Sequence, residues 1–299
     1  MRRFKITVAY DGTGLVGWQR QAAGTSIQGL LEHALGQLDE RDVTVIGAGR
    51  TDAGVHALGQ VASFSLAREI APGAVVRALN ARLPDSVRVL TAIEVPTAFH
   101  ARFGARAKTY RYRLWNSEVL SPFEHQYAWH LVGAIDVAEM AAAARIVEGR
   151  HDFAAFQAAG AATRTTEREL FSSRIDRVSM RSAAGGGEDA EETAFLRTGF
   201  DLRPPPADGG AFRRGDLLIY EVRGSGFLRH MVRNIVGTLV EIGRGRHPAA
   251  WMGEVLASCN RTQAGPTAPA AGLFLVSVEY EAPPAVERVN PADASPPAI

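Results

Sequence analysis

The sequence predicts an α/β fold of the α+β type, in which strands and helices are mixed within each half of the chain. Two observations predict it. Alternating, β-rich segments recur along the chain, and both halves also carry apolar residues at helical spacing. With 299 residues, of which 46% are hydrophobic and 22% charged, the chain can bury a substantial core. These values exclude a wholly disordered, collagenous or fibrous chain.

The first predicted half covers residues 1–104. Thr25 and Gln28 have the spacing of a capping box, and an apolar stripe at helical spacing follows them, so a helix is expected here. Pro72 opens a second helix with its own apolar face. Four strands accompany these helices, at residues 4–10, 43–46, 60–66 and 87–95.

The second predicted half covers residues 105–281. Helices are expected from Asp136 to Val147 and over residues 226–242, and strands at 109–115, 170–178, 216–223 and 272–280. Residues 181–215 hold a glycine run, an acidic cluster and three consecutive prolines, which predict a flexible insertion. Residues 282–299 hold five prolines in eighteen positions and are predicted to form a disordered tail.

The balance of charges limits the kind of partner. Lys and Arg total 33 and Asp and Glu 32, so the formal net charge is +1. This excludes a uniformly basic nucleic-acid binder but leaves room for a local basic face. The one cysteine, Cys259, excludes an intramolecular disulfide and a cysteine-based zinc cluster, and it fits a reducing compartment. No apolar stretch approaches the length of a membrane span, so we expect a cytoplasmic protein.

A glycine motif follows the first predicted strand. Gly12, Gly14 and Gly17 have the GxGxxG spacing of a dinucleotide-binding turn. That site needs its third glycine inside a helix, whereas the first helix signal here comes only at Thr25. A glycine-rich turn that approaches a ligand's backbone is the simpler interpretation, and a dinucleotide-dependent oxidoreductase stays open as an alternative.

A second glycine-rich loop, GAGRTDAGVH, spans residues 47–56. It holds Asp52 among glycines that let the backbone turn sharply, with Arg50 before it and His56 after it. Asp52 is either a catalytic carboxylate or an ordinary turn residue. Arg50 is either a site residue or a surface cation, and His56 either a site residue or a hydrogen-bonded structural residue.

Cations and aromatic rings alternate before and within the predicted strand at 109–115. No acidic residue occurs from Val95 to Ser117. Cations can follow phosphates and aromatic rings can stack on bases, so this window suits RNA binding. It equally suits a strand with a tyrosine core face and a solvated basic face. The window contains Phe99, Arg102, Phe103, Arg106, Lys108, Tyr110, Arg111, Tyr112, Arg113 and Trp115.

The helix predicted at 226–242 carries an apolar stripe that belongs in a core. Arg233 lies outside that stripe. It could point at a catalytic carboxylate, although a solvated arginine is the commoner outcome at such a position.

These segments together resemble one family, the tRNA pseudouridine synthase A family. The matching stretches occur in the family's order and run from about Phe4 to Tyr280. They are YDGTGLVGWQRQ, TSIQGLLEHAL, AGRTDAGVHALGQVASF, NARLPDSVRV, FHARFGARAKTYRYRLWN, GRHDFAAF, GFLRHMVRNIVGTLVEIGRG and APAAGLFLVSVEY.

The resemblance implies two pseudo-related α/β halves whose antiparallel-rich sheets join into one large mixed sheet with a central RNA-binding cleft. It implies a homodimer that binds the tRNA anticodon stem-loop and isomerises uridines 38, 39 and 40 without a metal or cofactor. By similarity, Asp52 is the essential aspartate, Tyr110 stacks on the target base, Arg233 pairs with the aspartate and Arg50 helps to hold the flipped nucleotide. The 181–215 insertion and the 282–299 tail depart from the family pattern. A non-catalytic RNA-binding module is the remaining alternative.

Overall fold

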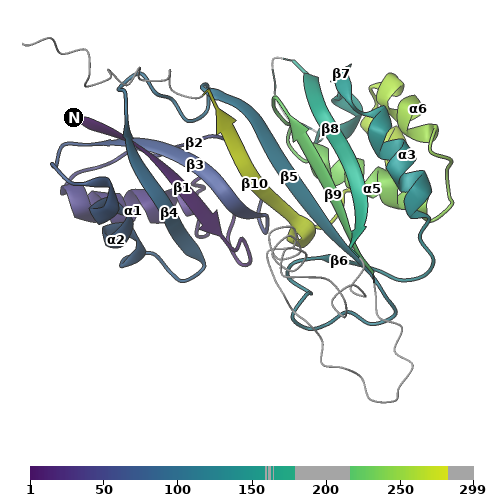
Figure 1. Ribbon diagram of the computed structural model, residues 1–299, viewed down its shortest axis with the longest axis horizontal. Helices are drawn as coiled ribbons and strands as arrows, with labels where there is room; N and C mark the ends of the chain where they lie inside the picture. The colour runs from purple at the N-terminus through teal and green to yellow at the C-terminus, as the bar shows by residue number, and fades with distance from the viewer. Residues whose placement is uncertain (159, 161–162, 164, 179–215, 282–299) are drawn as a thin grey trace, which may run out of the picture.

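A computed structural model describes residues 1–158, 160, 163, 165–178 and 216–281 (Figure 1). Within residues 1–104, three main strands and a two-residue strand accompany two helices. In chain order these elements are β1 (Arg2–Tyr10), α1 (Ile27–Asp39), β2 (Ile46–Gly47), β3 (His56–Leu66), α2 (Pro72–Asn80) and β4 (Val87–Val95).

The following part of the chain contributes further strands and helices to the same sheet. They are β5 (Ala105–Asn116), β6 (Trp129–Leu131), α3 (Val137–Ile146), β7 (Gly149–Asp152), β8 (Glu167–Val178), β9 (Asp216–Gly224), α5 (Met231–Gly243), α6 (Trp251–Ser258) and β10 (Leu273–Tyr280). The predicted insertion at 181–215 and the tail at 282–299 lie outside the described residues.

The strands form one mixed sheet in the order β4-β1-β3-β10-β5-β9-β8-β7, with β2 on β3 and β6 on β5. β10, the last strand of the described residues, lies in the middle of it, between β3 and β5 (Figure 1). It runs parallel to β3, with Phe274 opposite His56, and antiparallel to β5, with Leu275 opposite Tyr110. The expected α+β fold with one large mixed sheet is confirmed, and β10 joins the two sides of the sheet.

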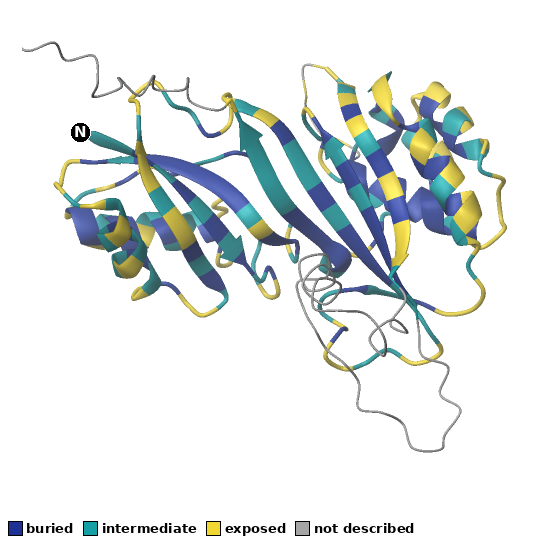
Figure 2. Cartoon of the chain, in the orientation of Figure 1, coloured by how far each residue is buried: buried dark blue, intermediate teal, exposed yellow. Residues whose placement is uncertain are grey.

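Helices cover the sheet on both sides of this central strand. In Figure 1, α1 and α2 lie beside β1, β3 and β4, while α3, α5 and α6 lie beside β8 and β9. Burial alternates along β1, as expected for a strand with one face on a core. In Figure 2, buried residues, drawn in dark blue, occur along the strands and in the helices on both sides of the sheet. The apolar stripe of α5, which includes Ile235 and Leu239, is fully buried.

The segment predicted as a strand at 43–46 forms only β2, at Ile46–Gly47. Val45 is buried, but α1 satisfies its backbone: its amide donates to Glu32 Oε1 at 3.1 Å, and its carbonyl accepts from Gln28 Nε2 at 3.2 Å. Side chains thus take the place of a neighbouring strand. The cap of α1 is also shifted by one residue, since Ser26 Oγ, rather than Thr25, accepts from the Gly29 amide.

The helix predicted from residue 226 begins only at Met231. His230 has a φ of 63°, in the left-handed region, so the right-handed helix cannot extend through it. Three further elements, α6, β6 and β7, are absent from the sequence-based prediction. They are eight residues or shorter, and periodicity is a weak signal over such lengths.

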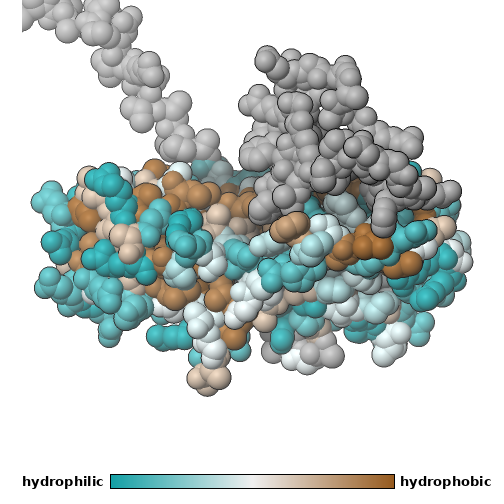
Figure 3. All heavy atoms as spheres, turned by 90° about the horizontal axis from the view of Figure 1, so that it is seen from below, coloured by the Kyte–Doolittle hydropathy of each residue, from teal (hydrophilic) through white to brown (hydrophobic). Residues whose placement is uncertain are grey.

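The molecular surface is mixed in character. On the face shown in Figure 3, hydrophobic residues gather in patches between hydrophilic ones. In the described part of the chain, no helix combines the length and the hydropathy that crossing a membrane requires.

Candidate active site

Asp52 lies in the turn between β2 and β3, and two of the GxGxxG glycines of the β1–α1 connection, Gly12 and Gly17, contact that turn. The Trp18 amide donates to the Thr51 carbonyl at 3.0 Å. A Cβ on Gly17, whose φ is 97°, would lie 2.4 Å from the Thr51 oxygen, and a Cβ on Gly12 would lie 2.2 Å from the Val55 oxygen. Only glycine fits at these positions, because the two loops touch backbone to backbone.

This geometry contradicts the dinucleotide interpretation of the glycines. β1 runs antiparallel to both its neighbours, β3 and β4, whereas a dinucleotide fold needs parallel strands. Helix α1 begins at Ile27, well past Gly17. Gly12 and Gly17 therefore pack against the Asp52 turn, and they do not form a helix N-terminus for a pyrophosphate.

Residues from the second half of the chain face the Asp52 carboxylate. Arg233 Nη1, on the first turn of α5, lies 3.5 Å from Asp52 Oδ2, and His230 Nε2 lies 3.5 Å from the same oxygen. The Asp52 side chain is 26% exposed, so the cluster is half-buried and still open to solvent. The structure thus brings together Asp52 and Arg233, the pair that the resemblance implies, and adds His230.

The Arg233 guanidinium is also fixed by Ala268, on the edge that carries Nε. Its Nε donates to the Ala268 carbonyl at 2.7 Å, and the Ala268 amide donates to the Arg233 carbonyl at 3.1 Å. Because the guanidinium is planar and its Nε is committed, Nη1 has a defined direction toward Asp52.

His230 is a site residue that the sequence did not reveal. Its left-handed backbone is uncommon for a residue with a side chain, and such conformations concentrate at functional sites. Burial lowers the pKa of His230; Asp52 raises it, and the arginines Arg233, Arg229 and Arg261 lower it further. The net direction is downward, so the ring is neutral at neutral pH and offers one N–H donor. No sequence pattern signals a left-handed histidine.

Tyr110, on β5, is buried beside this cluster. Burial raises the pKa of its hydroxyl well above the usual range, and electrostatic interaction with Tyr10 and Asp52 raises it further. Phe227 lies edge-on against the Tyr110 ring, with centroids 4.9 Å apart. The structure therefore places Tyr110 near Asp52, with one side of its ring covered by Phe227.

Arg50 is exposed, two residues before Asp52. Within the described ranges, neither a hydrogen bond nor an ion pair involves its side chain. The structure keeps Arg50 on the Asp52 turn but does not bring it into the Arg233 cluster.

His56 has a structural role. Its side chain is almost fully buried, Nδ1 accepts from the Gly12 amide at 3.0 Å, and Nε2 faces the Gln126 and Ala271 carbonyls. These partners fix the Nε2–H tautomer. Burial lowers the pKa of His56 below its usual value, so the ring is neutral and links three loops.

The window of basic and aromatic residues contains buried or ion-paired residues on β5 and exposed residues before that strand. Tyr112 is fully buried, and Arg113 is buried in an ion pair with Glu124 at 2.9 Å, so the expected solvated basic face is wrong at this position. Arg111 pairs with Glu221 at 2.8 Å. Phe103 is 79% exposed, with Arg102 above its ring. Sequence alternation could not reveal these partners, because the acidic residues come from distant segments.

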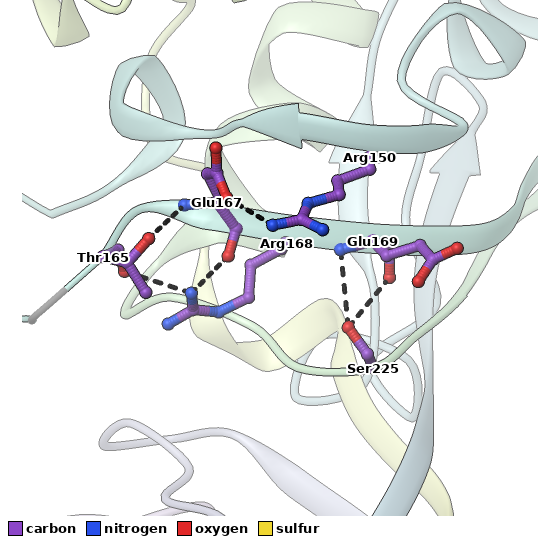
Figure 4. Close-up of a pocket in the computed structure, with 6 residues that line it drawn as sticks. All are labelled: Arg150, Thr165, Glu167, Arg168, Glu169 and Ser225. Atoms are coloured by element: carbon purple, nitrogen blue, oxygen red, sulfur yellow. Dashed lines mark hydrogen bonds and ion pairs between the residues drawn. The ribbon is translucent and has the colours of Figure 1, made fainter.

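A polar pocket opens near β7 and β8, at a distance in the sequence from Asp52. It has a volume of about 210 Å³ and is lined by Arg150, Thr165, Glu167, Arg168, Glu169 and Ser225 (Figure 4). Arg150 is paired with Glu167 at 2.7 Å. This pocket contains no part of the Asp52 cluster.

One oxygen of the Asp52 carboxylate faces both the fixed Arg233 guanidinium and the His230 ring, where the two sides of the sheet meet. This arrangement defines a candidate enzyme active site.

A family model described as tRNA pseudouridine synthase matches residues 6–104 and 143–281. A protein of Solibacter usitatus named tRNA pseudouridine synthase A is 44% identical over 285 residues, covering 94% of this chain and 100% of its own. One of Myxococcus xanthus with the same name is 42% identical, covering 98% of both chains.

The chain belongs to the tRNA pseudouridine synthase family, which confirms the family resemblance and the expectation of an isomerase. The family model covers the segments that carry Asp52 and Arg233, and the alignments with the two relatives span nearly the whole chain.

Proposed function

We propose that this chain is a cytoplasmic, homodimeric enzyme that isomerises uridine to pseudouridine at positions 38, 39 and 40 of the tRNA anticodon stem-loop, with Asp52 as the essential carboxylate. The observation that carries the proposal is the Asp52 cluster. Arg233 Nη1 and His230 Nε2 both lie 3.5 Å from Oδ2, which leaves the other carboxylate oxygen for the substrate.

The reaction explains why these residue types are needed. The N1–C1′ bond breaks, the uracil turns, C5 bonds to C1′, and the proton on C5 is lost while N1 gains one. Every atom of the product comes from the substrate except exchangeable protons, so no co-reactant is required. Because the sugar–base bond is enclosed in a stacked helix, the target nucleotide has to leave the stack. Asp52 either adds to the ribose or removes the C2′ proton; both routes need an ionised carboxylate.

The other named residues act on the base and the nucleotide. Tyr110 supplies a ring for stacking on uracil, and its hydroxyl is protonated because burial raises its pKa. Phe227 covers one side of that ring, so a base either displaces Phe227 or approaches from the open side. Arg50 is exposed on the Asp52 turn and has the charge to hold the flipped nucleotide.

Asp52→Asn tests the proposal. With a tRNA transcript carrying tritium at uridine C5, the native chain should release tritium to water without an added cofactor. Asn keeps the shape of the side chain and removes its charge, so release should stop while tRNA affinity stays within a few-fold. Asp42→Asn is the matched control, because Asp42 is an exposed carboxylate in the preceding loop. Turnover retained in Asp52→Asn, or no release by the native chain, would contradict the proposal.

The finer parts of the proposal have separate tests. A transcript with cytidine in place of uridine at position 38, 39 or 40 should release less tritium than the unsubstituted transcript, by the amount that the missing uridine would release. Sedimentation of the free protein should give the mass of a dimer. A non-catalytic RNA-binding module would bind these transcripts without any release.

A further inference from the structure

Two polar side chains lie on an otherwise apolar face of the sheet, next to the turn that holds Asp52. Gln60 of β3 is fully buried and lies opposite Val8 of β1. Tyr10, at the end of β1, is buried on the same face, because residues two apart on a strand point to the same side. Burying polar groups is unfavourable unless hydrogen bonds satisfy them, so the partners of these two side chains need an explanation. The other buried residues of this face on β1 and β3 are Phe4, Ile6, Val8, Ala62, Phe64 and Leu66.

Hydrogen bonds join both side chains to the Asp52 turn. The Tyr10 hydroxyl and Thr51 Oγ1 are 2.9 Å apart. Gln60 Nε2 donates to the Gly49 carbonyl at 3.0 Å and, more weakly, to the Tyr10 hydroxyl at 3.4 Å. Burial raises the pKa of Tyr10 to about 12, so its hydroxyl keeps its proton. Because the Tyr10 oxygen already accepts from Gln60, that proton is directed to Thr51.

These contacts hold the chain that leads into Asp52. Thr51 directly precedes Asp52 and is held at two points, since its hydroxyl is bonded to Tyr10 and its carbonyl accepts from the Trp18 amide at 3.0 Å. Gln60 holds the carbonyl two residues before Thr51. The backbone on the N-terminal side of the carboxylate is therefore fixed from within the core.

The contacts to Asp52 from across the site are looser. Arg233 Nη1 and His230 Nε2 both lie 3.5 Å from Oδ2, beyond the roughly 2.7–2.9 Å of a charge-assisted hydrogen bond. These two groups attract the carboxylate without fixing its direction. The direction has to come from the turn that carries Asp52.

We propose that Tyr10 and Gln60 are positioning residues for the isomerisation, which act through Thr51 and Gly49 to fix the direction of the Asp52 carboxylate. This inference rests on the proposed function. Both side chains are buried, so they act on the reaction through the turn and not by contact with the RNA. A fully satisfied buried network makes a site rigid, and a catalytic group needs to be held within about 0.5 Å of its productive position.

A matched pair of tyrosine variants separates positioning from stability. Tyr10→Phe removes the hydroxyl and keeps the ring. Tyr220→Phe is the control, because Tyr220 of β9 is also fully buried and its hydroxyl lies 2.8 Å from Ser173 Oγ. β10 and β5 separate β9 from β3 in the sheet. Both variants lose the same kind of hydrogen bond, so the midpoint of thermal unfolding should fall by similar amounts.

Tritium release should distinguish the two variants. Under single-turnover conditions, Tyr10→Phe should lower the rate at least about tenfold, since a displacement of about 1 Å can cost about 100-fold. Its affinity for an anticodon stem-loop RNA should stay at the native value, and Tyr220→Phe should keep the native rate. Equal rates in the two variants overturn the proposal, as does a rate that falls only in proportion to RNA affinity.

Substitutions of Thr51 test the same hydrogen bond from its other end. Thr51→Val keeps the shape and removes the hydroxyl, so it should lower the rate as Tyr10→Phe does. Thr51→Ser keeps the hydroxyl and should retain most of the rate that Thr51→Val loses. The double variant Tyr10→Phe/Thr51→Val should be no slower than the slower single variant, because both remove one interaction. If Tyr10→Phe unfolds at the assay temperature, the Thr51 pair decides, and equal rates in Thr51→Val and Thr51→Ser overturn the proposal.

Gln60→Met tests the second positioning residue. It keeps the length of the side chain and removes the donors to Gly49 and Tyr10, so the rate should fall while RNA affinity is kept. A native rate in Gln60→Met overturns the role of Gln60. The native chain, assayed in parallel, separates the two proposals. No tritium release by it contradicts the proposed function, whereas native release with equal rates in Tyr10→Phe and Tyr220→Phe overturns this inference alone.

Discussion

At the scale of single residues, some side chains near the candidate site have conformations or surroundings that lower the stability of the folded state. His230 has a left-handed backbone, Lys108 is buried among like charges, and Asp52 shares one oxygen between two partners. The first two arrangements are less favourable than a right-handed backbone or a solvated lysine. Substitutions at these positions should therefore separate activity from stability.

Arg233→Lys tests the contact with Asp52. Lysine keeps the charge but cannot donate to the Ala268 carbonyl and face Asp52 at the same time, so turnover should fall at least tenfold. RNA affinity should change less, because Arg233 is one of many cations in the chain and the substitution keeps its charge. Single-turnover kinetics and a binding isotherm on the same RNA measure the two effects. A solvated Arg233 would instead tolerate lysine with a change under ~0.5 kcal/mol in stability and native turnover.

Lys108→Met should stabilise the protein. The pKa of Lys108 falls from its ordinary value of 10.5 to about 8 in the fold, so the folded state holds its proton less tightly than the unfolded state. Below pH 8 both states are charged and the folded state bears the whole burial cost, at most about 3 kcal/mol. As the pH rises from 8 toward 10.5, the folded state loses the proton first and the cost disappears. The variant should therefore gain about 1–3 kcal/mol in the free energy of unfolding at pH 7, and less at pH 9.5. Urea unfolding of both proteins at the two pH values measures this, and an equal gain at both would contradict the shifted lysine.

At the scale of elements, two loops that the sequence separates act as one unit. The β1–α1 connection carries the GxGxxG glycines, and the β2–β3 turn carries Asp52. Their backbones touch at Gly12 and Gly17, and the Gly54 amide also donates to the Leu15 carbonyl at 3.3 Å. The position of the carboxylate is therefore set by glycines in another loop.

Gly17→Ala and Gly14→Ala form a matched pair that tests this dependence. Both glycines have a positive φ, but a Cβ on Gly14 would meet nothing within 4 Å, whereas one on Gly17 would lie 2.4 Å from the Thr51 oxygen. Gly14→Ala should cost about 1 kcal/mol of stability and leave turnover near that of the native chain. Gly17→Ala should cost more and lower turnover severely, because the Asp52 turn has to move. Thermal unfolding and tritium release measure both; equal turnover in the two variants would show that the contact does not matter.

At the scale of the whole molecule, one strand joins the two sides of the sheet. β10 comes last among the described strands and lies between β3 and β5, so the sides are connected through it as well as through the chain. The active site shares this dependence, because Asp52 belongs to one side and Arg233 to the other.

Two truncations test the role of β10. Ending the chain after Glu281 removes residues 282–299, which the sequence predicts to be a tail, and should leave unfolding cooperative and turnover unchanged. Ending it after Gly272 removes β10 and exposes the edges of β3 and β5, so cooperative unfolding and turnover should both be lost. Calorimetry of the two proteins, with tritium release as the activity readout, distinguishes them. A stable, active chain without β10 would refute its joining role.

The sequence by itself determined the local elements and the family. Alternation predicted β4 at residues 87–95, Asp136 was recognised as the start of α3, and the AGRTDAGVHA segment carried the resemblance. Such features depend on residues close together in the chain, where spacing reports which side faces the core. Only the tertiary structure decided that β10 is central, that Val45 is satisfied by side chains of α1, and that Asp52, His230 and Arg233 meet. The tertiary structure also decided which charged residues lie near Lys108 and Arg113. Ion pairs and burial depend on segments that are distant in sequence, and a local pattern does not show which distant segment lies opposite.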